Sequence, residues 1–181
     1  MAFKAPTLFN LQDGQRAERK LLITVAEWQE FTTGTATVTK REVLGRRTED
    51  SSIEMNPDIA TSTDILGNNY TDVNKTQPQQ DFDPFLILGG SRLAAILNDC
   101  RRRNALSELS QFTIYVISAF QGNSSDGYEC EKQTDCTITP NSIGGDANVN
   151  MPISVYFSNK NTTGTVNKLT DDFEFTPDVS V

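Results

Sequence analysis

Apolar and polar residues alternate in several short runs of the chain, and these runs predict β-strands. Residues 20–28 (KLLITVAEW) are rich in β-branched and aromatic side chains, and residues 32–44 (TTGTATVTKREVL) place threonine on one face against alanine and valine on the other. Residues 1–19 show no such period, so we expect an extended N-terminal arm there. The first quarter of the chain therefore predicts an arm followed by two strands.

The strand pattern is lost from about residue 45 to residue 80, where polar and turn residues dominate. Only SSIEM (51–55) continues a strand pattern. A loop of this length is uncommon in a compact domain, so the segment is a functional loop, a disordered one or a mistaken assignment of its elements. Isolated apolar residues recur through the segment, so we expect a long inter-strand loop or arm, parts of which can bury apolar surface on other surfaces, including another subunit.

One segment has helical periodicity. From about residue 91 to residue 103 the apolar residues follow an i, i+3, i+4, i+7 spacing, with Ser91 as the expected N-cap. The arginines at 101–103 complement a helix C-terminus, which we favour over a phosphate-binding role. Residues 111–120 (QFTIYVISAF) then predict a central strand, because they are apolar on both faces.

The last third of the chain predicts short strands. GYECEK and DCTITP indicate two strands on either side of Gln133. Residues 147–159 alternate, and the apolar face consists of Val149, Met151, Ile153, Val155 and Phe157. GTVNKL (164–169) and DDFEFTP (171–177) predict two further strands.

Together these elements predict a mainly β fold, a β-sandwich or barrel with one flanking helix. We expect a single domain over residues 20–177, which includes the long loop at about 45–80 and the helix at about 91–103. Extended arms at 1–19 and 178–181 complete the predicted organisation.

Composition and charge restrict the function. The chain has 181 residues, no histidine, and 16 Lys+Arg against 24 Asp+Glu, which gives a net charge of −8. The absence of histidine excludes a Ser/His/Asp triad, a Cys/His pair and an HExxH zinc helix. The acidic balance argues against binding of nucleic acid through its phosphates, but it suits a surface that faces nucleic acid without holding it.

No apolar stretch is long enough to span a bilayer, and the N-terminal residues lack the apolar region of a signal peptide. We therefore expect no membrane partner and synthesis in the cytosol. In that compartment Cys100, Cys130 and Cys136 are expected to be free thiols, although the spacing of Cys130 and Cys136 allows a disulfide across a hairpin. Three cysteines without a fourth ligand make a poor zinc site.

Carboxylates are plentiful, but none of their clusters has the features of a catalytic pair or a calcium loop. The dense spots are Glu49/Asp50, Asp81/Asp83 and Asp171/Asp172. Solvated charge is the ordinary state of such groups in loops and strand ends. We therefore expect no enzyme activity, no catalytic residues, no metal and no cofactor.

Particular strings resemble the major tail proteins, or tail-tube proteins, of long-tailed phages and prophages of Gram-positive bacteria. The strings are LGRRTEDSSIEMN, TDILGN, QPQQDFDPF and NSIGGDANVNMPISVYFSN, followed by the short GTV and FEFTP strands. The resemblance runs from about Glu42 to Pro177.

This resemblance implies a structural protein of the virion that is assembled in the cytoplasm of the host. In that family a β-sandwich with one helix forms hexameric rings, which stack into a tube through which the genome passes. The implied partners are further copies of the chain, the tail-tip initiator, the tape-measure protein and the tail terminator. DNA passes only transiently and without sequence specificity.

The family's long loop bridges subunits and rings, and its position matches residues 45–80 of this chain. The candidate residues for such contacts are Arg46, Arg47, Ile53, Met55, Ile59, Ile65, Leu66 and Tyr70. Alternating strands leave one face free of the core. On that basis the candidate lumen-facing residues are Thr35, Thr37, Thr39, Asn148 and Asn150.

Two functions of other classes remain open. One is a β-sandwich that binds carbohydrate or a cell surface, whose sign is an exposed aromatic platform, and a single tryptophan makes that sign weak. The other is a metal-dependent hydrolase without a recognisable motif, which metal content after purification distinguishes. Rings or tubes formed by the purified protein distinguish the tail-tube interpretation from both.

Overall fold

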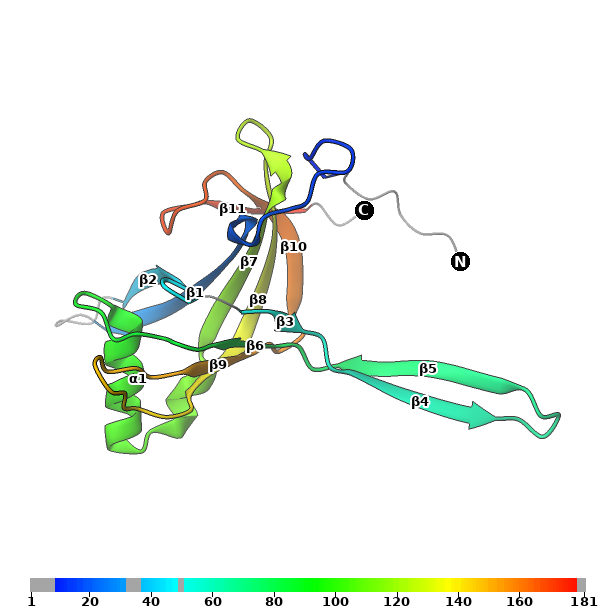
Figure 1. Cartoon of the computed structure of the whole chain (residues 1–181), viewed down its shortest axis with the longest axis horizontal. Helices are drawn as coiled ribbons and strands as arrows, with labels where there is room; N and C mark the ends of the chain where they lie inside the picture. The colour runs from blue at the N-terminus through cyan, green and yellow to red at the C-terminus, as the bar shows by residue number, and fades with distance from the viewer. Residues whose placement is uncertain (1–8, 32–36, 49–50, 179–181) are drawn as a thin grey trace. The chain divides into compact units, whose positions relative to one another are not determined.

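The computed structural model describes residues 9–31, 37–48 and 51–178, and these residues are mainly β (Figure 1). The strands are β1 (Leu22–Phe31), β2 (Thr37–Val43), β3 (Ile53–Glu54), β4 (Pro57–Thr63), β5 (Asn69–Thr76), β6 (Gln79–Phe82), β7 (Phe112–Asn123), β8 (Gly127–Pro140), β9 (Ile153–Tyr156), β10 (Asn161–Val166) and β11 (Phe175–Pro177). The described residues also contain one α-helix, α1 (Arg92–Arg103), and two 3₁₀ turns, η1 (Arg19–Leu21) and η2 (Leu106–Ser110). The predicted mainly β fold with one helix is confirmed, and its antiparallel sheets are consistent with a β-sandwich.

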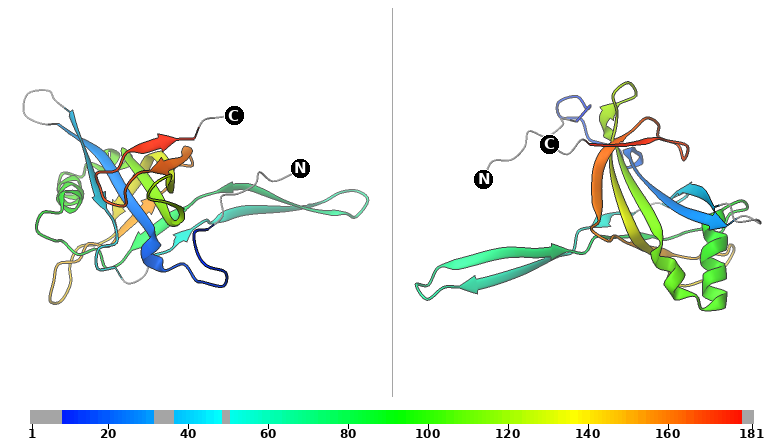
Figure 2. Two further views of the ribbon diagram at one scale, coloured as in Figure 1. Left: turned by 90° about the horizontal axis from the view of Figure 1, so that it is seen from above. Right: turned by 180° about the vertical axis from the view of Figure 1, so that it is seen from behind.

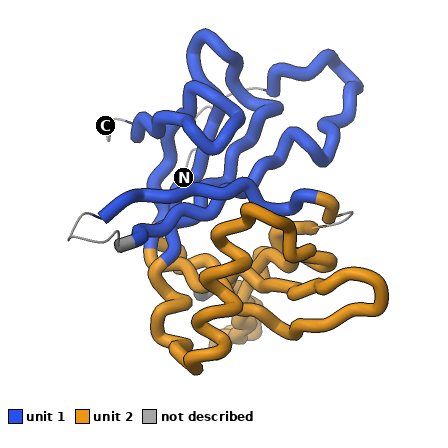
Figure 3. Tube along the Cα trace, turned by 90° about the vertical axis from the view of Figure 1, so that its left-hand side faces the viewer, with its two compact units in different colours: residues 1–46, 112–134, 161–181 blue, residues 47–111, 135–160 orange. Residues whose placement is uncertain are grey.

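The chain forms two compact units, which Figure 3 colours separately. Unit 1 combines residues 1–46, 112–134 and 161–181, and unit 2 combines residues 47–111 and 135–160. The strand pattern did not predict this division. Each unit is described by itself below.

β8 is one strand of 14 residues, and it contributes to both units. The prediction of two short strands on either side of Gln133 is therefore wrong. Gln133 is buried, and its backbone pairs with Asn161 of β10, while Thr137 onward pairs with β9. A polar side chain does not interrupt a strand whose backbone groups keep their partners.

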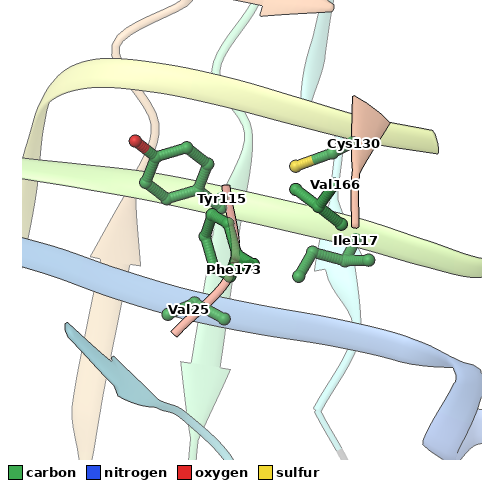
Figure 4. Packing of buried hydrophobic residues seen from close by; sticks show 6 residues of the cluster. All are labelled: Val25, Tyr115, Ile117, Cys130, Val166 and Phe173. Carbon is green, nitrogen blue, oxygen red and sulfur yellow. The ribbon is translucent and has the colours of Figure 1, made fainter. Parts of the chain in front are cut away.

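Unit 1 is built on strands in the order β2-β1-β7-β8-β10-β11. Its core is a cluster of six buried side chains drawn in Figure 4: Val25, Tyr115, Ile117, Cys130, Val166 and Phe173. The Tyr115 and Phe173 rings meet edge to face, with centroids 4.9 Å apart. Six of the 12 residues of β7 are buried and five are half-buried, in agreement with its two apolar faces.

The described part of the predicted N-terminal arm docks on β7. Phe9 pairs with Gln121, and its ring packs on Phe120 at 5.6 Å between centroids. The Asn10 side chain also donates a hydrogen bond to the Gly122 carbonyl at 2.6 Å. Residues 1–8 and 179–181 lie outside the described residues.

Unit 2 contains the end of β8 followed by β9, β6 and β3, together with α1. α1 begins after Ser91, whose side chain accepts a hydrogen bond from the Ala94 amide at 3.2 Å, so the predicted N-cap is confirmed. Of the predicted apolar stripe, the helix buries Leu93, Ala94, Leu97 and Cys100, whereas Ile96 is half-buried.

The alternation predicted over residues 147–159 holds only from residue 151 onward. Met151, Ile153 and Val155 are buried, whereas Val149 is 53% exposed. β9 is limited to residues 153–156, and the segment before it pairs only through isolated bridges. Val149 therefore belongs to a surface loop and not to the apolar face of a strand.

The loop predicted over residues 45–80 is wrong in its secondary structure. Short β3 pairs with β6, and between them β4 and β5 form a two-stranded sheet of their own. This hairpin is the long ribbon at the right of Figure 1 and appears again in both views of Figure 2. The apolar pattern did not predict β4 and β5 because both strands are mainly polar. A ribbon that is exposed on both faces needs no apolar face.

Candidate functional site

The β4–β5 hairpin exposes nearly all of its side chains. Every residue of β4 is exposed, and among the described residues β4 and β5 have no strand partner besides each other. A two-stranded hairpin on its own is at best marginally stable in water. A hairpin of this length therefore gains order from its root, from its tip or from a partner.

The two faces of the hairpin differ in composition. The register pairs Ile59 with Val73, Thr61 with Thr71 and Thr63 with Asn69, and side chains directly opposite each other share a face. Five of these six residues are β-branched, a type that packs well on a pleated surface. The other face pairs Ala60 with Asp72 and Ser62 with Tyr70.

Hydrogen bonds hold the root of the hairpin within unit 2. The Gln77 amide donates to the Met55 carbonyl at 3.2 Å, and the Asn159 side chain donates to the Thr76 carbonyl at 2.6 Å. Before β3, the Ser51 hydroxyl donates to the Asp81 carbonyl at 2.7 Å. The ribbon therefore leaves the unit from a fixed base.

A carboxylate orders the hairpin tip, residues 64–68. One oxygen of Asp64 accepts hydrogen bonds from the Leu66 and Asn68 amides, each at 2.8 Å. The other accepts from the Asn68 side chain at 2.9 Å and from the Tyr70 hydroxyl at 3.0 Å. The bonds from Asn68 are the main cause that lowers the pKa of Asp64 from 3.8 to about 2. Gly67 supplies the left-handed turn, with φ of 84°.

The ordered tip presents two apolar side chains to solvent. Ile65 is fully exposed and Leu66 is 81% exposed. Along the rest of the hairpin and its root, Met55, Ile59, Tyr70 and Val73 are each at least half exposed. These side chains come from one hairpin and its root, and exposed apolar side chains that gather on one element are candidates for an interaction surface.

The structure places five of the eight predicted contact residues on the hairpin or its root: Met55, Ile59, Ile65, Leu66 and Tyr70. Ile53 is half-buried in β3, where it pairs with Gln80. Arg46 and Arg47 are exposed but precede β3, outside the hairpin. Val73, which is 62% exposed on β5, was not among the predicted contact residues.

The predicted lumen-facing residues fall in both units. Thr37 and Thr39 are exposed on β2 of unit 1, and Thr35 lies outside the described residues. In unit 2, Asn148 is exposed, whereas Asn150 accepts a hydrogen bond from the Phe85 amide at 2.9 Å. Asn150 therefore has a structural role in its loop.

Unit 1 contains a pocket of about 700 Å³ at the polar end of its core. Arg41 lies over the Phe173 ring, 4.3 Å from its centroid, and forms an ion pair with Glu27 at 2.6 Å. The Lys132 ammonium lies 5.7 Å from the centroids of both Tyr115 and Phe175. The chain's own cations already contact these rings, which argues against a stacking platform for sugar.

Burial keeps two ionisable groups of unit 1, Tyr115 and Cys130, in their neutral forms. Burial, with Glu27 as a second cause, raises the pKa of Tyr115 to about 12. Burial also raises the pKa of Cys130 to about 12, so both groups stay protonated at neutral pH. All three cysteines are free, as predicted.

Residues 9–31, 37–48 and 51–178 contain no group of three or more His, Cys, Asp or Glu side chains arranged to hold a metal ion. None of their helices combines the length and the apolar character needed to cross a membrane.

No protein-family model matches the sequence, and no curated protein matches it either. The functional argument therefore rests on the residues and on their arrangement.

Proposed function

We propose that this chain is a phage tail-tube protein, a structural protein that assembles into stacked hexameric rings around a passage for DNA. Its partners are other copies of itself, and at the ends of the tube the tail-tip initiator, the tape-measure protein and the tail terminator. The sequence strings that resemble major tail proteins support this proposal. The mainly β fold with one helix agrees with what they imply.

The observation that carries the proposal is the exposed β4–β5 hairpin. Its root is hydrogen bonded and its tip is ordered, yet its apolar side chains have few contacts within the chain. A pre-organised surface loses little conformational entropy on binding, so such a hairpin is suited to hold a neighbouring subunit. A ribbon of about 20 Å carries these apolar side chains well beyond its own root.

The charge of the chain supports the passage of DNA. A ring of identical subunits multiplies the net charge of −8, and duplex DNA is itself densely negative. Acidic walls repel DNA and prevent it from adhering. Thr37, Thr39 and Asn148 stay candidates for uncharged positions that face the passage.

Electron microscopy of the purified protein tests the proposal. We expect rings or tubes of uniform diameter at high protein concentration, and growth into tubes when the tail-tip initiator is added. A protein that stays monomeric under both conditions contradicts the proposal.

A deletion tests the role of the hairpin. Residues 57–76 are replaced by a short Gly/Ser linker, and the control carries the same linker inserted between Ser124 and Ser125 in the β7–β8 turn. We expect the deletion variant to keep a cooperative thermal transition, because β4 and β5 pair only with each other among the described strands. We also expect it to lose assembly, while the control assembles normally.

Two results contradict this expectation. Assembly by the deletion variant shows that the hairpin is not the assembly arm. Loss of its cooperative transition shows that the hairpin belongs to the fold of unit 2.

A further inference from the structure

Three charged side chains extend the core-facing side of unit 1 at one end. They are Glu27 on β1, Arg41 on β2 and Lys132 on β8. Residues two apart on a strand share a face. Each of the three lies two residues from a side chain of the core cluster or one packed on it: Val25, Val43 and Cys130. Charged side chains on a core-facing side are normally paired, so the partners of these three are informative.

Two of the three charges satisfy each other. The Arg41 Nε donates to a Glu27 oxygen at 2.6 Å, and the Tyr115 hydroxyl donates to the same carboxylate at 3.3 Å. Lys132 forms no ion pair with a carboxylate of the described residues. Its ammonium lies 5.7 Å from the ring centroids of both Tyr115 and Phe175, near the limit of about 6 Å for attraction between a cation and a ring. Lys132 therefore carries the unbalanced charge of the group.

This charge borders a cavity. Glu27, Arg41 and Lys132 all line the pocket of about 700 Å³ in unit 1. Small-molecule sites typically have volumes of about 300–1,000 Å³. The Tyr115 hydroxyl lies at the end of the core cluster away from Cys130, and Tyr115 also lines the pocket (Figure 4). The core of unit 1 therefore ends in a cavity of suitable size with charged walls.

Two acidic residues line the same pocket from the segment before β11. Asp172 accepts hydrogen bonds from the Lys168 ammonium at 2.6 Å and from the Thr170 hydroxyl. Asp171 is exposed and forms no ion pair with a cation of the described residues. Asp171 therefore lies in the pocket wall without neutralising Lys132 by direct contact.

We propose that this pocket binds a small molecule through one oxyanion, a carboxylate or a phosphate group, which lies between Lys132 and Arg41. Both cations lie near one ring, 5.7 and 5.4 Å from the Tyr115 centroid, and an anion between them offsets their mutual repulsion. The Arg41 Nε donates to Glu27 and its Nη1 to the Phe173 carbonyl. Its Nη2 has no hydrogen bond within the described part of the chain and is left to donate to the ligand.

The surroundings favour a small anion over a nucleic acid strand. The chain has a net charge of −8, and Asp171 and Asp172 line the pocket, so a polyanion is repelled at close range. A single oxyanion needs only the two cations. This inference is independent of the proposed function, because every residue that it uses belongs to unit 1 of a single chain.

An NMR titration of the full chain tests the site, at concentrations where the protein is monomeric. The probes are sodium phosphate and sodium acetate, each added at an ionic strength held constant with sodium chloride. We expect the Lys132 side-chain signals and the Arg41 Nε–H signal to move and to saturate, with a dissociation constant of about 1–10 mM. The signals of Lys160, which pairs with Asp135 at the surface, should not saturate. Saturation with one probe only identifies which oxyanion the pocket accepts.

Two pairs of variants test whether the pocket itself binds the anion. Lys132→Gln should weaken binding at least about 10-fold, whereas Lys160→Gln, with the same change of net charge, should leave the affinity unchanged. Asp171→Asn removes the competing carboxylate and should strengthen binding about three-fold. Its control, Asp146→Asn, makes the same change at an exposed position of unit 2 and should have no such effect. The Arg41 Nε–H signal is followed in all four variants.

Three outcomes overturn the inference. The first is the absence of a saturable shift at Lys132 with both probes. The second is an equal affinity in Lys132→Gln and Lys160→Gln, and the third is equal strengthening in the two aspartate variants, since net charge alone then explains the binding. If Trp28 fluorescence shows that Lys132→Gln does not fold, the unaltered protein and the aspartate variants still decide. A failure to form rings or tubes leaves these results unaffected, so the two proposals fail separately.

Discussion

The core of unit 1 and the β4–β5 hairpin use the same residue types in opposite surroundings. The matched pairs, with their exposed fractions, are Val25 (0%) and Val73 (62%), Ile117 (0%) and Ile59 (56%), and Tyr115 (2%) and Tyr70 (51%). In both regions the residues lie on strands. The side chains alone therefore do not determine which surface the chain covers and which it leaves to solvent.

The difference in exposure comes from the neighbouring strands and covering segments that surround each strand. Val25 and Ile117 lie on β1 and β7, which have strand neighbours on both sides and a covering segment around Phe173. Ile59 and Val73 lie on a ribbon that pairs only with itself among the described strands. The core side chains stabilise the unit, whereas those of the hairpin are available to stabilise an assembly.

The largest expected effect is a difference in the free energy of unfolding when the matched residues Ile117 and Ile59 are each changed to alanine. Ile117→Ala removes methyl groups from a fully buried site and should lower the free energy of unfolding by about 2–5 kcal/mol. Ile59→Ala removes the same atoms from an exposed ribbon and should change it by less than about 0.5 kcal/mol. Urea unfolding, followed by circular dichroism at concentrations where both variants are monomeric, measures the two values.

A second readout separates stability from assembly in the same two variants. Trp28, the chain's single tryptophan, is buried against Phe112 and reports on unit 1 by its fluorescence. Ile59→Ala should leave that signal unchanged and should weaken assembly. Equal losses of stability in the two variants would show that the hairpin packs on its own chain in solution.

The sequence predicted the elements with strong periods. The helix and its Ser91 cap were predicted correctly, as were β1, β7 and the burial of Ile153 and Val155, because burial on one or both faces leaves a regular apolar pattern. The same logic failed between residues 45 and 80. An exposed ribbon has no buried face, and its strands are therefore indistinguishable from a loop by periodicity alone.

The candidate site was predicted by residue but not by arrangement. Ile65 and Leu66 were candidates because apolar residues in a polar segment are unusual, and their exposure agrees with that reasoning. The role of Asp64 was not predictable, because its four hydrogen bonds form only once the turn has closed. The pairing of Leu86 with Asn150 was not predictable either, because the two residues lie far apart in the sequence and no local pattern encodes such a contact.

A smaller effect is expected at the edge of the core, where Arg41 joins the apolar cluster to the pocket. Its guanidinium contacts Glu27, the Phe173 carbonyl and two aromatic rings, and its side chain is 23% exposed. Arg41→Ala should lower the free energy of unfolding by about 1–3 kcal/mol. Arg41→Lys should lower the free energy of unfolding by a smaller amount, because a lysine ammonium cannot donate paired hydrogen bonds as the planar guanidinium does.

An exposed arginine provides the control for this measurement. Arg16→Ala should change the free energy of unfolding by less than about 0.5 kcal/mol. If Arg41→Ala also leaves the free energy of unfolding unchanged, the Arg41 side chain does not belong to the cooperative core of unit 1.

The smallest expected effect concerns the order of the hairpin tip and its dependence on pH. The pKa of Asp64 is lowered from 3.8 to about 2, because Asn68, Tyr70 and Leu66 donate hydrogen bonds to its ionised form. A lowered pKa in the folded turn means that ionisation stabilises the turn. That contribution is complete above pH 3.8 and is lost as the pH falls toward 2.

Carbon-detected NMR of the Asp64 carboxyl group, at concentrations where the protein is monomeric, measures this pKa. We expect a midpoint at about pH 2, and a higher midpoint in Tyr70→Phe, which removes one donor. The amide signals of Leu66 and Asn68 should move with the same midpoint, since both donate to this carboxylate. A midpoint at 3.8 would show that the tip is not ordered in the free chain, and the hairpin would then gain its order only on binding a partner.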